Sequence, residues 1–152
     1  MIKENSKIKN FDLKISETNS IQVKQLLGKK IIIFFYPKDD TPGCTKEAIS
    51  FSEKIKVFEK YNAVIFGVSK DSLKKHENFK LKHNIEVNLA SDTGDICELF
   101  GVWVEKSMYG KKYMGIERST FFIDENQIVK KIWRKVKVSG HVDEVLEVIK
   151  DS

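Results

Sequence analysis

The residue of this chain whose type and position best fit covalent chemistry is Cys44. It lies in the segment Phe35-Tyr-Pro-Lys-Asp-Asp-Thr-Pro-Gly-Cys-Thr-Lys-Glu47. Thr41 is a good helix N-cap and Pro42 suits the first helical position, so Cys44 is expected in the first turn of a helix. Unpaired backbone N–H groups and the helix dipole at that end favour a thiolate over a thiol. Because the thiolate is the nucleophilic form, the segment predicts a reactive Cys44 that is substantially ionised at neutral pH.

Cys44 also fits a purely structural role, because it falls on one face of the expected helix together with other apolar residues. An isolated cysteine on such a face is commonly a buried apolar filler. The helix-start signals and the position after a buried strand favour the reactive role, since open α/β sheets place their sites at strand ends. The apolar face, at steps of four and three residues, comprises Cys44, Ala48, Phe51, Ile55 and Phe58.

The strand before this segment and the elements after it must position Cys44. Lys30 to Tyr36 is a continuous β-branched and aromatic run, which is typical of a central strand covered on both faces. A helix from Asp71 to about His83, with Asp71 or Ser72 at its cap, lies between two further strands. The other expected elements are strands at 11–13 and 21–23, a brief helix ending near Gly28, strands at 63–68 and 87–90, a short helix at 94–100, a hairpin of 119–123 and 128–133, and a last helix after Gly140.

The order of these elements predicts an α/β protein with a central mixed β-sheet flanked by helices. A thioredoxin-like fold fits that order. The 152 residues contain no internal repeat, low-complexity tract or linker, so we expect one domain over 1–152. Residues 104–116 are expected to form a connection that contains lysine and glycine.

The composition is that of a soluble globular protein, with 41% hydrophobic and 32% charged residues. The first residues, Met1 to Lys7, are charged and polar with no apolar segment behind them, so no signal peptide is visible. The longest apolar run, Ile31 to Tyr36, is far too short to span a bilayer. These features predict a cytoplasmic protein that does not act on a membrane.

The net charge of +5 raises the question of nucleic-acid binding. The lysines are scattered over every segment and mixed with acidic residues, whereas a binding face would concentrate them, so we expect a solvated basic surface and no nucleic-acid partner. Of the 27 lysines and arginines, only Arg118 and Arg134 are arginines. Each arginine is therefore a candidate for a fork-shaped donor that lysine cannot replace. The three histidines, His76, His83 and His141, lie in polar helical contexts and are assigned no role.

The two cysteines, Cys44 and Cys97, lie far apart and form no Cys-x-x-Cys pair or Cys/His cluster. A structural zinc site is therefore not expected. A permanent disulfide is not expected in a reducing compartment either. The remaining possibility is that one of the two cysteines acts as a single reactive thiol.

The motif around Cys44 is similar to that of a known family. Pro37-x-x-x-Thr41-x-x-Cys44 matches the peroxiredoxin active-site pattern, and Thr41-Pro-Gly-Cys-Thr-Lys-Glu47 resembles the bacterioferritin-comigratory-protein (PrxQ) branch. This resemblance implies a thioredoxin-like fold and a thiol-dependent peroxidase that uses no metal, haem or flavin. It continues through Val68-Ser-Lys-Asp-Ser72, Ala90-Ser-Asp92, Phe100-Gly-Val-Trp103, Gly115-Ile-Glu-Arg-Ser-Thr-Phe121 and Trp133-Arg-Lys-Val-Lys-Val138.

The resemblance implies a role for each residue of the motif. Cys44 resembles the peroxidatic cysteine, which attacks the peroxide bond and becomes a sulfenic acid. Thr41 would hydrogen-bond the sulfur and the peroxide oxygen, and Pro37 looks like the lid that shields the sulfur from water. Arg118 resembles the active-site arginine that holds thiolate and peroxide together, although it could instead pair with a surface carboxylate.

Two further residues of the segment are carried over from the same resemblance. The N–H groups of Gly43 and Cys44 would complete the ring of donors that stabilises charge on the peroxide. Glu47, one turn into the helix, could orient the arginine or simply be solvated. Both alternatives for Glu47 stay open.

The resemblance breaks at the second, resolving cysteine, which reduces the sulfenic acid in most relatives of this type. In the commonest form of the branch it lies five residues after the first, where this chain has Ile49; in a second form it lies at the position of Lys80. Cys97 remains a possible resolving cysteine, but its short amphipathic context favours a structural role. We therefore predict a one-cysteine mechanism, in which thioredoxin, glutaredoxin or a small thiol reduces Cys44 directly.

The leading hypothesis is a peroxidase, a monomer or homodimer, that acts on hydrogen peroxide and organic hydroperoxides. The missing resolving cysteine gives weight to a second hypothesis, a non-catalytic redox sensor or partner-binding module on the same fold. The two differ in turnover, because a sensor stops after one oxidation. A thioredoxin-type oxidoreductase is least favoured, because it needs a Cys-x-x-Cys pair.

Overall fold

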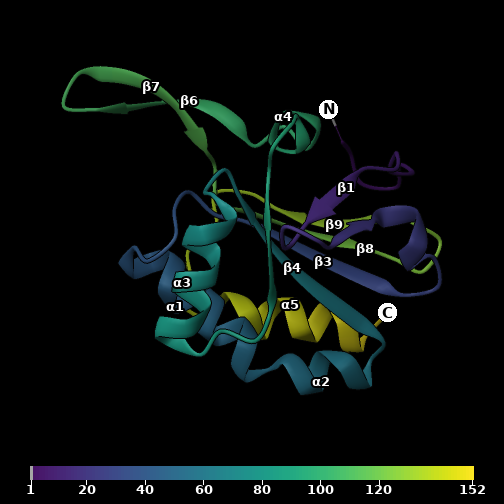
Figure 1. The fold of residues 1–152 in the computed structure, drawn as a ribbon. Coiled ribbons are helices and arrows are strands. Elements are labelled where there is room, and N and C mark those ends of the chain that lie inside the picture. The colour runs from purple at the N-terminus through teal and green to yellow at the C-terminus, as the bar shows by residue number, and fades with distance from the viewer. Residues whose placement is uncertain (1) are drawn as a thin grey trace.

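The computed structural model describes residues 2–152 and arranges them around one central seven-stranded sheet (Figure 1). The strands are β1 (Asp12–Lys14), β2 (Ser20–Gln22), β3 (Lys30–Phe35), β4 (Ala63–Ser69), β5 (Asn88–Ser91), β6 (Trp103–Met108), β7 (Lys111–Ile116), β8 (Ser119–Ile123) and β9 (Val129–Trp133). The helices are the 3₁₀ helix η1 (Val23–Leu26), α1 (Pro42–Glu53), α2 (Ile55–Lys60), α3 (Leu73–His83), α4 (Ile96–Leu99) and α5 (His141–Lys150).

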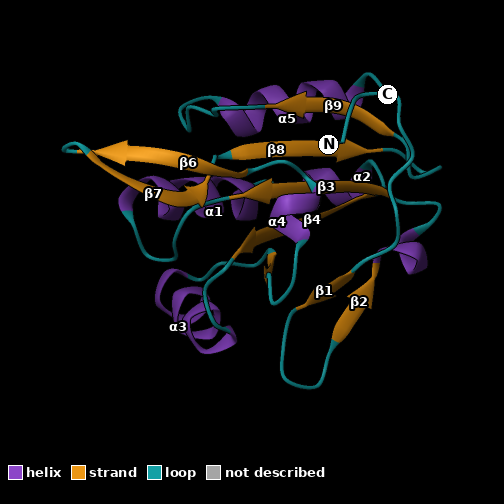
Figure 2. Ribbon diagram, turned by 90° about the horizontal axis from the view of Figure 1, so that it is seen from above, coloured by secondary structure: helices purple, strands orange, loops and turns teal. Residues whose placement is uncertain are grey.

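The sheet mixes parallel and antiparallel pairs, in the order β2-β1-β5-β4-β3-β8-β9. Strand β3 pairs in parallel with β4 and antiparallel with β8, and Figure 2 shows β9 and α5 at the opposite edge from β1 and β2. Helices α1, α2, α3 and α5 contribute to one apolar core, and α4 belongs to a second one. The prediction of a mixed sheet flanked by helices is confirmed.

Strand β3 separates these two cores, because successive side chains of a strand point to opposite faces. Ile32 and Phe34 lie in the core beneath α1, whereas Ile31 and Phe35 lie in the core that contains α4. All residues of β3 are buried, as expected for a central strand. Phe34 stacks on Phe51 of α1 with 4.6 Å between ring centroids, which fixes α1 against this face of the sheet.

The helix that begins beside Cys44 is interrupted, whereas the apolar stripe suggested one continuous element. Helix α1 ends at Glu53 and α2 begins at Ile55, with Lys54 between them. The Ser52 hydroxyl accepts the N–H of Glu86 at 2.9 Å, which ties the last turn of α1 to the segment before β5. Ile55, the first residue of α2, is only partly buried, whereas the rest of the stripe is in the core.

The prediction of a plain connection over residues 104–116 was wrong, because this segment forms the β6–β7 hairpin. Tyr109 and Gly110 both have positive φ, at 52° and 77°, which is the backbone of a two-residue hairpin turn. The strands pair only with each other and project from the main sheet (Figure 1). Neither strand is fully buried, so its sequence lacks the apolar alternation that reveals strands packed on a core.

The fold places the Cys44 segment at the end of the central strand. Residues 36–41 connect β3 to α1, and the N–H of Tyr36 donates to the carbonyl of Val68 at the end of β4, at 3.1 Å. The loop therefore starts where two parallel strands finish, the common place for sites in α/β sheets. No helix within residues 2–152 is long and apolar enough to cross a membrane.

Candidate active site

Cys44 lies in the first turn of α1 with its side chain almost fully buried. The turn begins as predicted, with Thr41 at the N-cap and Pro42 as the first helical residue. The N–H of Thr45 makes the first helical hydrogen bond, to the carbonyl of Thr41 at 2.8 Å, so the N–H groups before it have no partner within the helix. The sulfur of Cys44 is therefore buried, and it lies where the unpaired N–H groups of the first turn favour a negative charge.

The guanidinium of Arg118 contacts this sulfur. Its Nη2 donates to Cys44 Sγ at 3.3 Å, and its Nη1 donates to Glu47 Oε1 at 2.7 Å. Arg118 directly precedes β8, whose first residue Ser119 pairs with Phe35 at the end of β3. The sheet register thus carries the guanidinium to the start of α1, although the two residues lie far apart in the sequence.

Glu47 is completely buried, so the solvated alternative for this residue is wrong. Its side chain is 0% exposed, and Oε2 has no hydrogen-bond partner anywhere in residues 2–152. Burial raises the pKa of Glu47 to about 7, although the charge and hydrogen bond of Arg118 act in the opposite direction. Arg118 thus donates both to a buried carboxyl group and to the sulfur of Cys44.

The raised pKa of Glu47 makes a testable contribution to stability. The unfolded chain titrates this group near 4.5 and the folded protein near 7, so stability is greatest while Glu47 is protonated and falls as pH rises between those values. The loss amounts to about 3 kcal/mol of unfolding free energy. Glu47→Gln is neutral at every pH, so we expect this variant to gain about that amount on the wild type between pH 4.5 and 8, measured by urea unfolding.

The matched control is Glu53→Gln, which removes an exposed glutamate from the same helix. We expect the stability of this variant to follow that of the wild type across the same pH range. If Glu47→Gln and Glu53→Gln show the same pH dependence, Glu47 is not the buried titrating group.

The loop residues of the motif lie around the same turn. Thr41 occupies the N-cap, but its side chain makes no capping bond within the described residues. Its hydroxyl donates instead to the carbonyl of Lys38 at 2.9 Å. The expected donation from Thr41 to the sulfur is not formed while that hydrogen is held in the loop. Pro37 is exposed at the start of the loop. A Cβ atom on Gly43 would lie 3.2 Å from Arg118 Nη2, so a larger residue would crowd the guanidinium.

Cys97 lies on the opposite side of the sheet from Cys44. Cys44 belongs to the core beneath α1, and Cys97 belongs to the core on the other face, with the sheet between them. The N–H of Cys97 donates to Asp92 Oδ2 at 3.0 Å, and burial together with that carboxylate raises the pKa of the thiol. The fold therefore does not bring the two cysteines together, and it holds Cys97 in its less reactive, protonated form.

Two histidines that received no role are buried. His141 Nε2 lies 2.7 Å from the Thr120 hydroxyl, and burial lowers the pKa of His141 to about 4. His76 Nδ1 lies 2.6 Å from Asp39 Oδ2, in the loop before Cys44. Each histidine shares a helical face with an apolar residue, Val145 for His141 and Phe79 for His76. This spacing is the sequence signal that could have predicted their burial.

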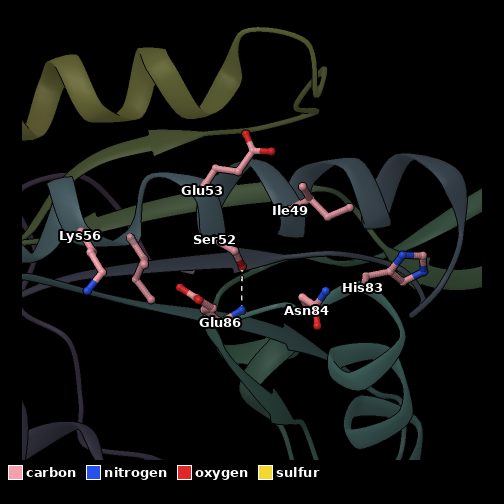
Figure 3. A pocket seen from close by; sticks show the side chains of 8 residues that line it. Ile49, Ser52, Glu53, Lys56, His83, Asn84 and Glu86 are labelled. Atoms are coloured by element: carbon pink, nitrogen blue, oxygen red, sulfur yellow. Dashed lines mark hydrogen bonds between the residues drawn. The ribbon is translucent and has the colours of Figure 1, made fainter.

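A cavity lies further along α1, away from the sulfur. It has a volume of about 400 Å³ and lies between the C-terminal part of α1, α2 and the end of α3 (Figure 3). Ile49 borders this cavity and also an open depression of about 410 Å³ that begins at Pro42 and Gly43. The depression adjoins the turn that holds Cys44.

Comparisons with known proteins agree on one family. The profile of the AhpC/TSA family matches residues 5–132. The putative peroxiredoxin bcp of Coxiella burnetii is 50% identical over 137 residues, which cover 90% of this chain and 91% of that protein. Peroxiredoxin Bcp of Bacillus subtilis is 47% identical over 146 residues, covering 95% and 93% of the two chains.

Solved structures give the same result. A structure of the Xanthomonas campestris bacterioferritin comigratory protein, from a study of its alkyl peroxide reduction activity, superimposes with a TM-score of 0.90 at 43% identity, covering 93% of this chain and 90% of that one. A mutant of Xylella fastidiosa PrxQ superimposes with a TM-score of 0.94 at 36% identity, covering 99% and 97% of the chains.

Proposed function

Because this chain belongs to the AhpC/TSA family and is a peroxiredoxin with a thioredoxin-like fold, we propose that it reduces hydroperoxides through Cys44 alone, in a one-cysteine mechanism. The observation that carries this proposal is the bond from Arg118 Nη2 to Cys44 Sγ at 3.3 Å. A partly buried cation beside a cysteine in the first turn of a helix stabilises the thiolate. It also stabilises negative charge that develops on the peroxide.

The oxidation step forms one bond and breaks another. The thiolate of Cys44 attacks one peroxide oxygen, so that an S–O bond forms as the O–O bond breaks. The leaving oxygen takes up a proton and departs as water or an alcohol, and the oxygen that stays on sulfur completes a sulfenic acid. Hydrogen peroxide and small organic hydroperoxides both contain the bond that this chemistry requires.

The surrounding residues have proposed roles in aligning the peroxide. The N–H groups of Gly43 and Cys44 lie in the first turn of α1, where they can donate to a peroxide oxygen. The Thr41 hydroxyl can join them by turning away from the Lys38 carbonyl. Pro37, at the start of the loop, limits access of water to the sulfur, and Glu47 holds Arg118 in place.

The sulfenic acid is then reduced by a thiol from another molecule. The external thiolate attacks sulfur, water leaves, and a second external thiol releases Cys44 and a disulfide product. Two observations support an external reductant: Cys97 lies across the sheet, and the depression next to Pro42 and Gly43 offers a thiol an approach to the turn. Thioredoxin, glutaredoxin and small thiols can all supply this external thiol. The proposed peroxidase is a cytoplasmic protein that acts as a monomer or homodimer.

Cys97→Ala tests the one-cysteine mechanism. We expect this variant to keep kcat/KM for hydrogen peroxide within about twofold of the wild type, with dithiothreitol as reductant, because Cys97 does not take part in either step. The measurement is steady-state peroxide consumption, with non-reducing peptide mapping after one turnover. A loss of turnover in Cys97→Ala, together with a Cys44–Cys97 disulfide in the wild type, would make Cys97 the resolving cysteine.

A redox sensor is the second candidate function, favoured by Ile49 and Lys80 at the two positions where relatives of this type carry their resolving cysteine. Repeated turnover decides between the two functions. A peroxidase consumes many equivalents of peroxide per chain when thiol is in excess, whereas a sensor consumes one. We expect many.

A further inference from the structure

The loop that carries the proposed peroxide-aligning residues is anchored by one buried carboxylate, Asp39. The side chain of Asp39 is only 4% exposed. Its Oδ1 accepts the hydroxyl of Tyr36 at 2.5 Å, and its Oδ2 lies 2.6 Å from Nδ1 of His76. The backbone N–H of Asp39 also donates to Asp71 Oδ2 at 2.6 Å. This residue therefore connects the middle of the loop to Tyr36 at its start, to helix α3 and to the segment before α3.

His76 is held from its other side as well. Its Nε2 lies 3.1 Å from the carbonyl oxygen of Ala90 in β5. A carbonyl oxygen can only accept, so Nε2 carries a hydrogen and Nδ1 faces the carboxyl group of Asp39. The 2.6 Å contact between Nδ1 and Asp39 Oδ2 therefore joins two buried polar groups by a short hydrogen bond. The imidazole thus spans the distance from the sheet to the loop.

Tyr36 completes the buried cluster as a donor. Burial, with the negative charge of Asp39, raises the pKa of Tyr36 well above its ordinary value, so the hydroxyl keeps its hydrogen and donates it to Asp39. Both oxygens of the Asp39 carboxyl group are therefore satisfied, which a buried carboxylate requires. Removing His76 would leave one of them without its partner.

We propose that His76 is a positioning residue for peroxide reduction, acting through Asp39 to hold the loop that carries Pro37 and Thr41. Asp39 lies two residues from each of them, so a shift of its carboxylate moves both residues relative to Cys44 Sγ. His76 touches no reacting atom. The proposal rests on the proposed chemistry at Cys44 and adds a determinant of how the peroxide is aligned. Small displacements of aligning groups cost much of a rate, up to about 100-fold for 1 Å.

A second tie between α3 and the same loop provides a matched control. His83 Nε2 lies 2.8 Å from Asp40 Oδ1, but the Asp40 side chain is 43% exposed. Water and salt screen an exposed pair, so its loss has a small effect. His76 and His83 are thus two histidines of one helix that contact neighbouring aspartates of one loop, one pair buried and one exposed.

The test compares His76→Leu, His76→Asn and His83→Leu in two separate reactions. Stopped-flow measurements give the rate constant for Cys44 oxidation by hydrogen peroxide and the rate constant for reduction of the sulfenic acid by dithiothreitol. We expect His76→Leu to slow oxidation about 10- to 100-fold and to change reduction less than about twofold. His76→Asn keeps an N–H donor near the Nδ1 position and should recover most of the oxidation rate. His83→Leu should change neither rate beyond about twofold.

Three results would overturn this proposal: wild-type oxidation in His76→Leu, equal losses in both reactions, or no recovery in His76→Asn. If His76→Leu does not fold, His76→Gln replaces it, because its amide reaches the Ala90 carbonyl but not Asp39. We then expect slow oxidation in His76→Gln and near wild-type oxidation in His76→Asn, and equal rates would contradict the role. Failure of the wild type to oxidise at Cys44 would instead count against the proposed function.

Discussion

Cys44→Ser is expected to abolish peroxide reduction, lowering kcat/KM for hydrogen peroxide by at least about 1000-fold. A serine hydroxyl is not ionised near neutral pH and cannot form the sulfenic acid. Because serine is close to cysteine in size, the fold should be retained, and circular dichroism can verify this. Peroxide consumption with dithiothreitol in excess measures the effect.

Cys97→Ser is the matched control for Cys44→Ser, since it makes the same chemical change at the other buried cysteine. We expect it to retain turnover. If Cys44→Ser still consumed peroxide at the wild-type rate, Cys44 would not be the nucleophile.

The second large effect is expected from Arg118→Lys. Lysine keeps the positive charge but presents its three N–H donors from a single nitrogen, so it does not reproduce the fork in which Nη1 bonds Glu47 and Nη2 bonds the sulfur of Cys44. We expect kcat/KM for hydrogen peroxide to fall about 100- to 1000-fold, the usual cost of removing a donor that stabilises developing charge. Stopped-flow oxidation of the reduced variant isolates this step from the reaction with thiol.

Arg134→Lys controls for the general effect of replacing an arginine. Arg134 donates to the carbonyls of Phe100 and Gly101, away from Cys44. We expect its oxidation rate to stay within about threefold of the wild type. An Arg118→Lys rate as high as that of Arg134→Lys would show that charge alone suffices and that the fork geometry is unimportant.

Local signals in the sequence account for the position of Cys44. Thr41 and Pro42 mark the start of α1, and the apolar run before them gives β3, because capping and periodicity act over a few residues. The contact between Arg118 and Cys44 was expected only from the family resemblance. It depends on the pairing of β8 with β3, and such long-range pairing leaves little trace in local sequence.

The burial of Glu47 and His76, unlike the start of α1, could not be predicted from local sequence signals. Both are polar residues on helices, and the residues that enclose them come from distant elements, such as Arg118 beside β8 for Glu47 and Asp39 for His76. A polar residue is normally exposed unless a specific partner is present. The partner has to be known before the burial can be inferred.

The β6–β7 hairpin could not be predicted because it has few packing partners. It packs little against the rest of the protein, so no core selects an alternating apolar pattern along its strands. Its turn is formed by Tyr109 and Gly110, and it has tyrosine where the Asn-Gly and Asp-Gly pairs that mark such hairpins most clearly have asparagine or aspartate.

Intact mass spectrometry of the reduced protein after one equivalent of hydrogen peroxide, with a sulfenic-acid trapping reagent, tests the central claim most directly. We predict a trapped adduct in the wild type and in Cys97→Ser, and none in Cys44→Ser. That result would establish a sulfenic acid on Cys44 that Cys97 does not resolve. A loss of two hydrogens that requires both cysteines would contradict the one-cysteine mechanism, and oxidation that proceeds equally without Cys44 would contradict the peroxidatic role itself.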